Sequence, residues 1–228
     1  MAHEKQALIE EHLRLVLRAN QRINLTRITD WQKALCLHVE DSLAGLKELA
    51  QAPEGSFADI GSGAGYPGIP LAIESGRSAA LIESVQKKAD ILEDIVSTLS
   101  LGQQIRVLAK RAEAVAREGE RFSALVVRAV SSLPVLMELA QPLLKPEGIL
   151  IAYKAELNAE ELQKARSLEA LLGMNLVDVR NILLSDESTK RSIITVCKQG
   201  EAQIALPRRD GVAQKRPLWQ QQSKGAST

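Results

Sequence analysis

The chain contains few aromatic residues and only two cysteines. Aromatic side chains make up 3% of its 228 residues, which argues against the base-stacking surfaces by which single-strand-binding proteins hold nucleic acid. The cysteines, Cys36 and Cys197, are too few and too far apart for a zinc site or a disulfide framework. Each lies in an apolar stretch, and we expect both to be buried structural thiols. Catalysis or shape recognition therefore fits the composition better than base stacking.

Long apolar runs are also absent. No stretch reaches the roughly 18 apolar residues of a membrane-spanning helix, and the first residues lack the basic and then apolar pattern of a signal peptide. We expect a cytoplasmic protein with no membrane partner. The hydrophobic fraction of 45% and the charged fraction of 25% are typical of a soluble globular chain that forms one generous domain with an appendage.

The net charge of +1 hides an asymmetry along the chain. Residues 189–228 carry eight lysines or arginines against only Glu201 and Asp210. Within them, residues 206–218 contain prolines, a glycine and no helical period, which indicates an extended basic arm able to lie along phosphates. The alternative is a solvated tail. The candidate RNA contacts of this arm are Arg208, Arg209 and Lys215.

The most informative motif is the run Asp-Ile-Gly-Ser-Gly-Ala-Gly-Tyr-Pro-Gly at residues 59–68. An apolar stretch precedes it and a helical pattern that opens with Pro67 follows it, so the run predicts a strand that turns tightly into a helix. Gly61, Gly63 and Gly65 occupy the turn. Glycine accepts positive φ and has no Cβ, so the backbone there can lie directly against a ligand. The alternative is a glycine-rich turn that binds nothing.

Two acidic neighbours favour a ligand. Glu83 ends the next apolar run, where its carboxylate can accept hydrogen bonds from ribose hydroxyls. Asp59 precedes the glycines, close enough to meet a positive group on the ligand. A dinucleotide fingerprint requires a third glycine where this chain has Tyr66. The turn therefore suits an adenosine-containing ligand without a pyrophosphate, such as S-adenosylmethionine.

Strand and helix patterns alternate after residue 55, which predicts an α/β fold with a mostly parallel seven-stranded sheet covered by helices on both faces. The last two strands follow each other directly and are expected to pair antiparallel at one edge. Expected strands are 56–60, 79–83, 104–108, 123–128, 148–153, 175–183 and 192–197; expected helices are 4–20, 31–50, 67–75, 85–100, 110–117, 133–144 and 158–172. A cap at Thr29 or Asp30 is expected to open the second helix. We divide the chain into an N-terminal helical extension (1–52), the sheet domain (53–200) and the basic arm (201–228), with residues 220–228 expected to be disordered.

In such a sheet, ligands bind at the carboxyl ends of the strands. The residues that follow the first strands suit one ligand: the glycine turn, Glu83, then Arg111 with Ala112 and Glu113, then Arg128. Arg111 and Arg128 can each be ordinary surface arginines, but both stand at strand ends on one rim. We expect them to border the site.

These residues resemble the RsmG (GidB) family of bacterial 16S ribosomal RNA guanine-N7 methyltransferases over about residues 20–218. The glycine run alone is generic to methyltransferases, whereas its combination with the other landmarks is specific. The landmarks are Asn24-Leu25-Thr26, His38 with Asp41-Ser42-Leu43, the run from Asp59 to Pro70 with its Pro-Gly-Ile-Pro, Glu83-Ser84 with Lys87-Lys88, Arg111-Ala112-Glu113, Arg128-Ala129-Val130, Lys154, and the terminal Pro-Arg-Arg and Lys-Arg-Pro-Leu.

The resemblance implies a Rossmann-like class I methyltransferase that uses S-adenosylmethionine, without a metal, on a specific guanine N7 in the 530 loop of 16S ribosomal RNA. Its partner is that RNA or the small ribosomal subunit, and we expect a monomer. The implied cofactor contacts are Gly61, Tyr66, Ala112, Glu113 and Arg128, in addition to Asp59, Gly63 and Glu83 from the pattern of the turn. Arg128 is also the residue expected to border methyl transfer, and the implied RNA contacts are Arg111, Arg191 and His38, besides the arm.

The resemblance is not complete. The family tends to have an aspartate where this chain has Ser123, and often a serine or threonine where it has Val126. These departures weaken a role for side chains within that strand and leave Arg128 in place. The match at Arg191 is loose, since Lys190 can align instead.

Methylation of guanine N7 needs few catalytic groups, because N7 carries a lone pair and no proton. No general base is required, and the chain has neither the Asn-Pro-Pro-Tyr type of run used on exocyclic amines nor the Pro-Cys pair used on cytosine. His38 is therefore interpreted as a helix-capping or RNA-contacting residue rather than a base. Two other functions stay open: methylation of another nucleic acid or a small molecule, and nucleotide binding without turnover.

Overall fold

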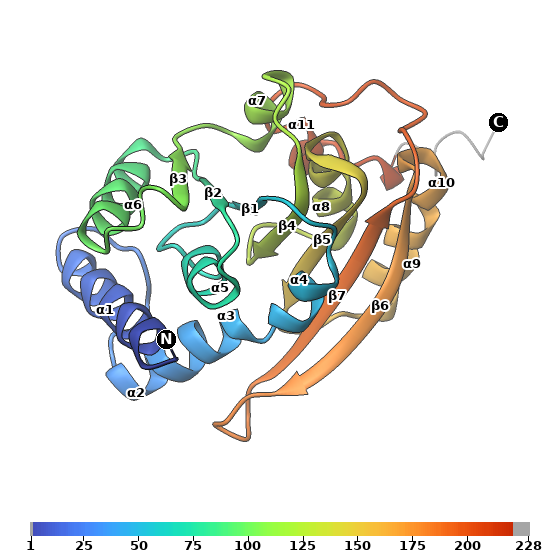
Figure 1. Ribbon diagram of the computed structural model, residues 1–228. Helices are drawn as coiled ribbons and strands as arrows, with labels where there is room; N and C mark the ends of the chain where they lie inside the picture. The colour runs from blue at the N-terminus through green and yellow to red at the C-terminus, as the bar shows by residue number, and fades with distance from the viewer. Residues whose placement is uncertain (1, 221–228) are drawn as a thin grey trace.

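The computed structural model describes residues 2–220 and is built around one seven-stranded sheet (Figure 1). The strand order is β3-β2-β1-β4-β5-β7-β6. Strands β1 to β5 are parallel, whereas β7 runs antiparallel to β5 and β6. This confirms the predicted mostly parallel α/β sheet with an antiparallel final pair. The strands are β1 (Phe57–Ile60), β2 (Ala79–Ile82), β3 (Ile105–Leu108), β4 (Phe122–Arg128), β5 (Leu144–Lys154), β6 (Met174–Leu183) and β7 (Lys190–Lys198).

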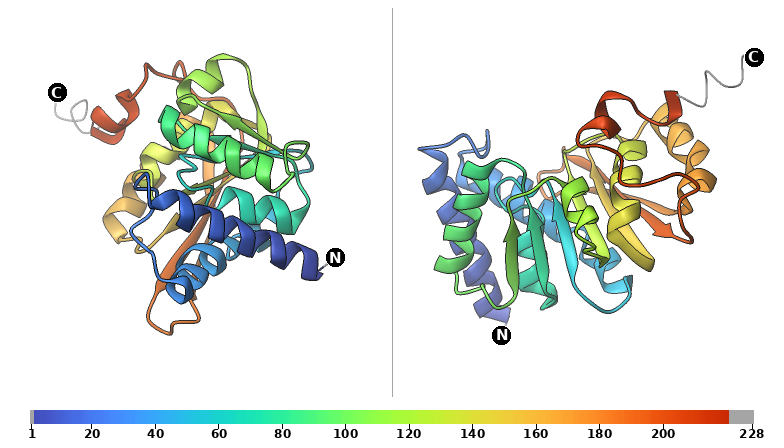
Figure 2. Two further views of the ribbon diagram at one scale, coloured as in Figure 1. Left: turned by 90° about the vertical axis from the view of Figure 1, so that its left-hand side faces the viewer. Right: turned by 90° about the horizontal axis from the view of Figure 1, so that it is seen from above.

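Helices cover both faces of the sheet, as Figure 2 shows from two further sides. Successive strand residues point to opposite faces, so Phe57 packs into one core and Ala58 into the other. The first face carries α1 (Ala2–Asn20), α5 (Gly68–Ser75) and α6 (Gln86–Thr98); the second carries α7 (Ala112–Arg117), α8 (Leu133–Ala140), the 3-10 helix η2 (Gln141–Leu143), α9 (Ala159–Ser167) and α10 (Glu169–Leu172). Two apolar cores therefore enclose the sheet between them and leave its carboxyl edge for the site.

The N-terminal extension shares the first core. Leu13 and Val16 of α1 are fully buried against the sheet layer, as is Leu49 farther along. Helix α1 packs on α5 and α6, and it lies at the left of Figure 1, below α6. The extension is thus part of the same packed body as the sheet.

The single helix expected at 31–50 is broken into four pieces. They are α2 (Trp31–Ala34), a π-helical stretch η1 (Leu35–Glu40), α3 (Asp41–Leu43) and α4 (Leu46–Gln51). Asp30 caps the start by accepting a hydrogen bond from the Lys33 amide, as one of the two expected caps. The break at Gly45 has a packing reason, because a Cβ there would collide with the hydroxyl of Tyr153, which donates to the Ser42 carbonyl at 2.7 Å.

The C-terminal segment (residues 206–218) is not the extended arm that its composition predicts. It contains the helical turn α11 (Val212–Lys215) and packs onto α8 through Ala213, which is almost fully buried. Its helical turn depends on long-range packing, which local composition does not encode. Of the segment expected to be disordered, residues 221–228 lie outside the described residues. No helix among residues 2–220 is long and apolar enough to cross a membrane.

The two cysteines are free thiols, and the prediction that both are buried is wrong. Cys36 and Cys197 are each only partly buried. Polar side chains reach both, because Ser185 Oγ lies 3.7 Å from the Cys36 sulfur and Gln199 Nε2 lies 3.2 Å from the Cys197 sulfur.

Candidate active site

The glycine turn joins the end of β1 to the start of α5 at the carboxyl edge of the sheet. Gly61, Gly63 and Gly65 all have positive φ. At Gly61 the need is also steric, because an added Cβ would lie 2.6 Å from the Val130 Cγ2 methyl. The Gly63 amide donates to Glu83 Oε2 at 3.0 Å, while Oε1 of the same carboxylate accepts from the Val85 amide at 2.8 Å. Glu83 therefore fixes the turn to the end of β2, with lone pairs left for a ribose.

Asp59 lies beneath the turn and is completely buried. Its Oδ2 accepts from the Gly68 amide at 3.0 Å, which ties the start of α5 to β1, while Oδ1 has no partner among the described residues. Burial is the main cause that raises the pKa of this carboxyl to about 7. Asp59 thus holds the turn against the start of α5, and its contact with a cofactor stays a prediction.

A small pocket of about 80 Å³ opens beside the turn, at the ends of β1, β2 and β3. Three predicted cofactor residues meet there: Gly61, Ala112 and Glu113. Arg111, predicted as an RNA contact, lines the same pocket instead of a separate surface. The complete lining is Ile60, Gly61, Ile82, Ser84, Lys110, Arg111, Ala112, Glu113, Val130, Leu139 and Gln214. About half of these residues are apolar and half are polar or charged, a combination that suits the apolar faces and polar edge of an adenine.

Tyr66 is buried in a column of three rings. Its ring stacks on His38 with centroids 4.8 Å apart and lies 4.5 Å from the ring of His12. The guanidinium of Arg128 is 5.6 Å from the Tyr66 centroid, within the range of a cation–π contact. The Tyr66 ring therefore packs against the guanidinium of Arg128. Tyr66, predicted to contact the cofactor, does not line the small pocket.

A second pocket of about 580 Å³ adjoins the first and contains three more of the predicted residues. Arg128 enters it from the end of β4, Arg191 from the start of β7, and His38 from η1. The complete lining is Ile28, Leu37, His38, Asp41, Arg128, Ala129, Ser131, Tyr153, Lys154, Ala155, Glu156 and Arg191. Its volume falls within the range of about 300–1,000 Å³ for ligand pockets.

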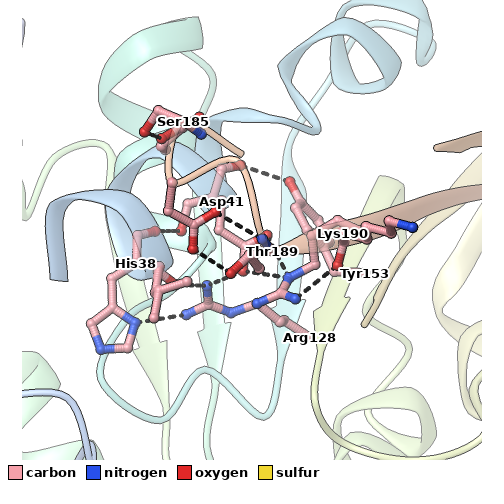
Figure 3. A network of polar contacts seen from close by, with 12 residues as sticks. His38, Asp41, Arg128, Tyr153, Ser185, Thr189 and Lys190 are labelled. Carbon is pink, nitrogen blue, oxygen red and sulfur yellow. Dashed lines mark hydrogen bonds and ion pairs between the residues drawn. The ribbon is translucent and has the colours of Figure 1, made fainter. Parts of the chain in front are cut away.

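Asp41 holds the two arginines of this second pocket in place. Its Oδ2 accepts from Arg128 Nη1 at 3.0 Å (Figure 3), and both of its oxygens lie within 3.1 Å of Arg191 Nε. Arg128 Nη1 also donates to the Leu37 carbonyl at 3.1 Å. Because Asp41 is almost fully buried, this pairing fixes two cations whose outer donors stay available to a ligand.

His38 is neutral in this environment. Burial and the charge of Arg128 lower the pKa of its imidazole to about 4. Nδ1 of His38 lies 3.5 Å from Arg128 Nη2, and its Nε2 lies 2.8 Å from Thr26 Oγ1. These contacts place His38 between Thr26 and Arg128, while its ring stacks on Tyr66.

The basic residues of the C-terminal segment differ in exposure. Arg208 makes a two-pronged ion pair with the buried Glu138, at 2.7 and 2.6 Å, so its charge is already compensated. Arg209 and Lys215 are exposed. Of the three predicted contacts, these two keep a charge that a phosphate can meet.

Sequence reasoning missed His12. It is fully buried in α1, and its Nε2 lies 2.9 Å from the Ala64 carbonyl within the glycine turn. Burial lowers the pKa of its imidazole to about 4. A signal existed, since His12 is a polar residue beside Ile9 and Leu13 on the apolar face of a predicted helix. Among residues 2–220 no group of three or more metal-ligating side chains is gathered.

The fold is that of Rossmann-like S-adenosylmethionine-dependent methyltransferases. An O-methyltransferase from Bacillus cereus, solved in complex with SAH, shares the fold with a TM-score of 0.58 at 18% identity, covering 84% of this chain and 90% of that chain. TrmN from Thermus thermophilus gives a TM-score of 0.51 at 18% identity, covering 68% of this chain and 47% of that chain.

The chain belongs to the GidB family, rRNA small subunit methyltransferase G, whose family model matches residues 5–192. Two relatives named "Ribosomal RNA small subunit methyltransferase G" are similar over nearly all of it. The one from Pelotomaculum thermopropionicum is 36% identical over 220 residues, covering 94% of this chain and 92% of the relative. The one from Desulfitobacterium hafniense is 38% identical over 203 residues, covering 87% and 83%. The family resemblance seen in the sequence is confirmed.

Proposed function

We propose that this protein transfers the methyl group of S-adenosylmethionine to N7 of one guanine in the 530 loop of 16S ribosomal RNA. One observation carries the proposal: the two pockets adjoin at the loop after β4. Val130 lines the smaller pocket, while its neighbours Ala129 and Ser131 line the larger one. A methyl donor in the first pocket would therefore lie next to a base held in the second.

The residues of the smaller pocket fit the donor. The positive-φ backbone of the turn permits close approach at Gly61, and Ala112 and Glu113 would border the adenine. Glu83, which is bound to the turn outside this lining, would accept from ribose hydroxyls. S-adenosylmethionine supplies an electrophilic methyl on a sulfonium. The ionised form of Asp59, buried beneath the turn, favours a cationic ligand above it.

The larger pocket would hold the guanine by its polar edge. Arginine donates readily to guanine O6, which is adjacent to N7, so Arg128 can bind O6 and leave the N7 lone pair free. Asp41 balances part of the positive charge of Arg128 and Arg191. Because N7 attacks without losing a proton, the neutral His38 need not act as a base. Fixing the two reactants in near-attack geometry supplies about 7–11 kcal/mol.

RNA affinity would come largely from phosphate contacts, which position the substrate, while the pocket selects the base. We expect affinity to fall steeply with salt. Replacing both Arg209 and Lys215 by glutamine should flatten the plot of log affinity against log salt concentration, by about 0.7 for each phosphate of single-stranded RNA that the variant no longer neutralises. Filter binding with a 530-loop RNA at several salt concentrations measures this slope. An unchanged slope in the double variant would show that these side chains do not contact phosphate.

The buried carboxyl of Asp59 should make cofactor affinity depend on pH. Its pKa is raised to about 7, so it is mostly neutral below pH 7 and mostly anionic above it. The anion attracts a sulfonium and an ammonium, so affinity should rise as pH increases through about 7. A gain of roughly tenfold corresponds to one pKa unit of coupling. Isothermal titration calorimetry from about pH 6 to about 7.5, on either side of the raised pKa, measures the affinity, and Asp59→Asn serves as the control.

The ligand's own amino group titrates identically with both proteins, so only the difference between them reports on Asp59. The same pH slope in wild type and Asp59→Asn would remove this residue from cofactor binding.

The function is tested by transfer of a labelled methyl group from S-adenosylmethionine to purified RNA. We expect label in 16S RNA or small subunits from a strain that lacks the modification, and none in 23S RNA. Digestion should then release labelled 7-methylguanosine from a single position. Label on another base, or on small molecules only, would favour the other methyltransferase functions, and cofactor binding without transfer to any acceptor would favour a non-catalytic role.

A further inference from the structure

The C-terminal segment crosses the mouth of the pocket that suits adenosine. The Gly211 amide donates to Glu113 Oε1 at 2.8 Å, and Gln214 is part of the pocket lining. Glu113 is one of the two residues predicted to hold the adenine, and it is itself buried. In Figure 1, α11 lies beside α7 and α8, close to the strand ends that form this pocket. Residues 206–218, which the composition predicts to be an RNA-binding arm, thus form one wall of the proposed cofactor pocket.

The segment is anchored on both sides of that contact. Before it, Arg208 pairs with Glu138 of α8, and Arg208 Nη2 also donates to the Arg216 carbonyl at 3.0 Å. After it, Ala213 and Leu218 are buried at 2% and 5% exposure. Gly211 turns the chain between the anchors with a φ of +71°, a left-handed conformation that favours glycine. The wall is therefore held in one position by identifiable contacts.

The wall leaves too little room for the whole cofactor. The pocket measures about 80 Å³, against about 300–1,000 Å³ for pockets that enclose small-molecule ligands. Moreover, the Gly211 amide binds an oxygen of the very carboxylate that borders the adenine. We propose that the C-terminal segment is a gate that competes with S-adenosylmethionine for Glu113 and must be displaced for the cofactor to enter. This inference rests on the proposed cofactor site.

A competing gate lowers the apparent affinity by the fraction of molecules in which it is open. Variants that loosen the gate should therefore bind S-adenosylmethionine faster and more tightly. The first variant is Arg208→Gln combined with Glu138→Gln, which removes the anchor without leaving a buried carboxylate unpaired. The second is Gly211→Ala, which disfavours the left-handed turn while nothing lies within 4 Å of the added Cβ.

Arg216→Gln is the matched control. It removes one positive charge from the same segment, at an exposed side chain whose backbone carbonyl, not its guanidinium, contacts Arg208. Association can be followed by the fluorescence of Trp219, which packs beside Ala213, in full-length protein with Trp31→Phe as the common background. Calorimetry gives the equilibrium affinity of each variant.

We expect both gate variants to associate with S-adenosylmethionine at least fivefold faster and to bind it at least threefold more tightly, while Arg216→Gln stays within twofold of the background. Unchanged or slower association in both gate variants would overturn the gate, as would equal effects in the control. Circular dichroism and melting confirm that each variant is folded. No binding of S-adenosylmethionine even by the wild type would overturn the proposed function itself, so the two failures are distinguishable.

Discussion

Gly61→Asp should abolish binding of S-adenosylmethionine while the protein stays folded. The new Cβ would lie 2.6 Å from Val130 Cγ2 at a φ of +73°, and a left-handed conformation costs an L-residue about 1–2 kcal/mol before any collision. The side chain would also fill the space between the turn and the pocket. We expect an affinity loss of at least about 100-fold, equivalent to about 2.7 kcal/mol, measured by calorimetry.

Gly76→Asp provides the matched control. Gly76 ends α5 with a φ of +72°, and nothing lies within 4 Å of an added Cβ. This variant carries the same backbone strain and the same charge outside the site, so it should lower thermal stability and keep cofactor affinity. Binding by Gly61→Asp within tenfold of wild type would place the cofactor elsewhere.

Arg128→Ala should retain most cofactor binding and lose methyl transfer. Its guanidinium lines the larger pocket rather than the smaller one, so its loss would remove the proposed contact to the reacting base. Removal of one donor aimed at the reacting group costs about 10²–10³ in turnover in comparable cases. Asp41 would keep Arg191 as its partner, so no buried carboxylate is left unpaired.

Single-turnover transfer to 16S RNA, combined with cofactor titration, separates the two effects for Arg128. Arg128→Lys should rescue only part of the rate, because an ammonium cannot donate to the Leu37 carbonyl and to Asp41 with the same planar geometry. Transfer by Arg128→Ala at the wild-type rate would move the reaction centre away from this arginine.

The mostly parallel sheet and its antiparallel final pair were predictable because each element follows from a local pattern. Period-two and period-3.6 apolar spacing marks each element, and parallel topology brings all strand ends to one edge. Gly61, Ala112 and Glu113 meet in one pocket, and Arg128 meets His38 and Arg191 in the next, although the expected helix that carries His38 contains a π-helical stretch.

What the sequence could not show depends on contacts between distant residues. The residues around Gly45 do not predict the approach of Tyr153, whose hydroxyl lies where a Cβ of residue 45 would be. Likewise, the residues around Arg208 do not predict its ion pair with Glu138, which binds the C-terminal segment to α8. The hydrogen bond from the Gly68 amide to Asp59 was also not predictable, because it joins β1 to the start of α5. Local composition predicts which side chains are exposed, but contacts between distant residues determine which of them are buried.

The sharpest test of the proposed methyl transfer is mass spectrometry of 16S ribosomal RNA from a strain in which the gene for this chain is deleted. We predict the loss of one 7-methylguanosine from the 530 loop, its return with a plasmid copy of the wild type, and no return with Arg128→Ala. An unchanged set of 7-methylguanosines in the deletion strain would contradict the proposed function.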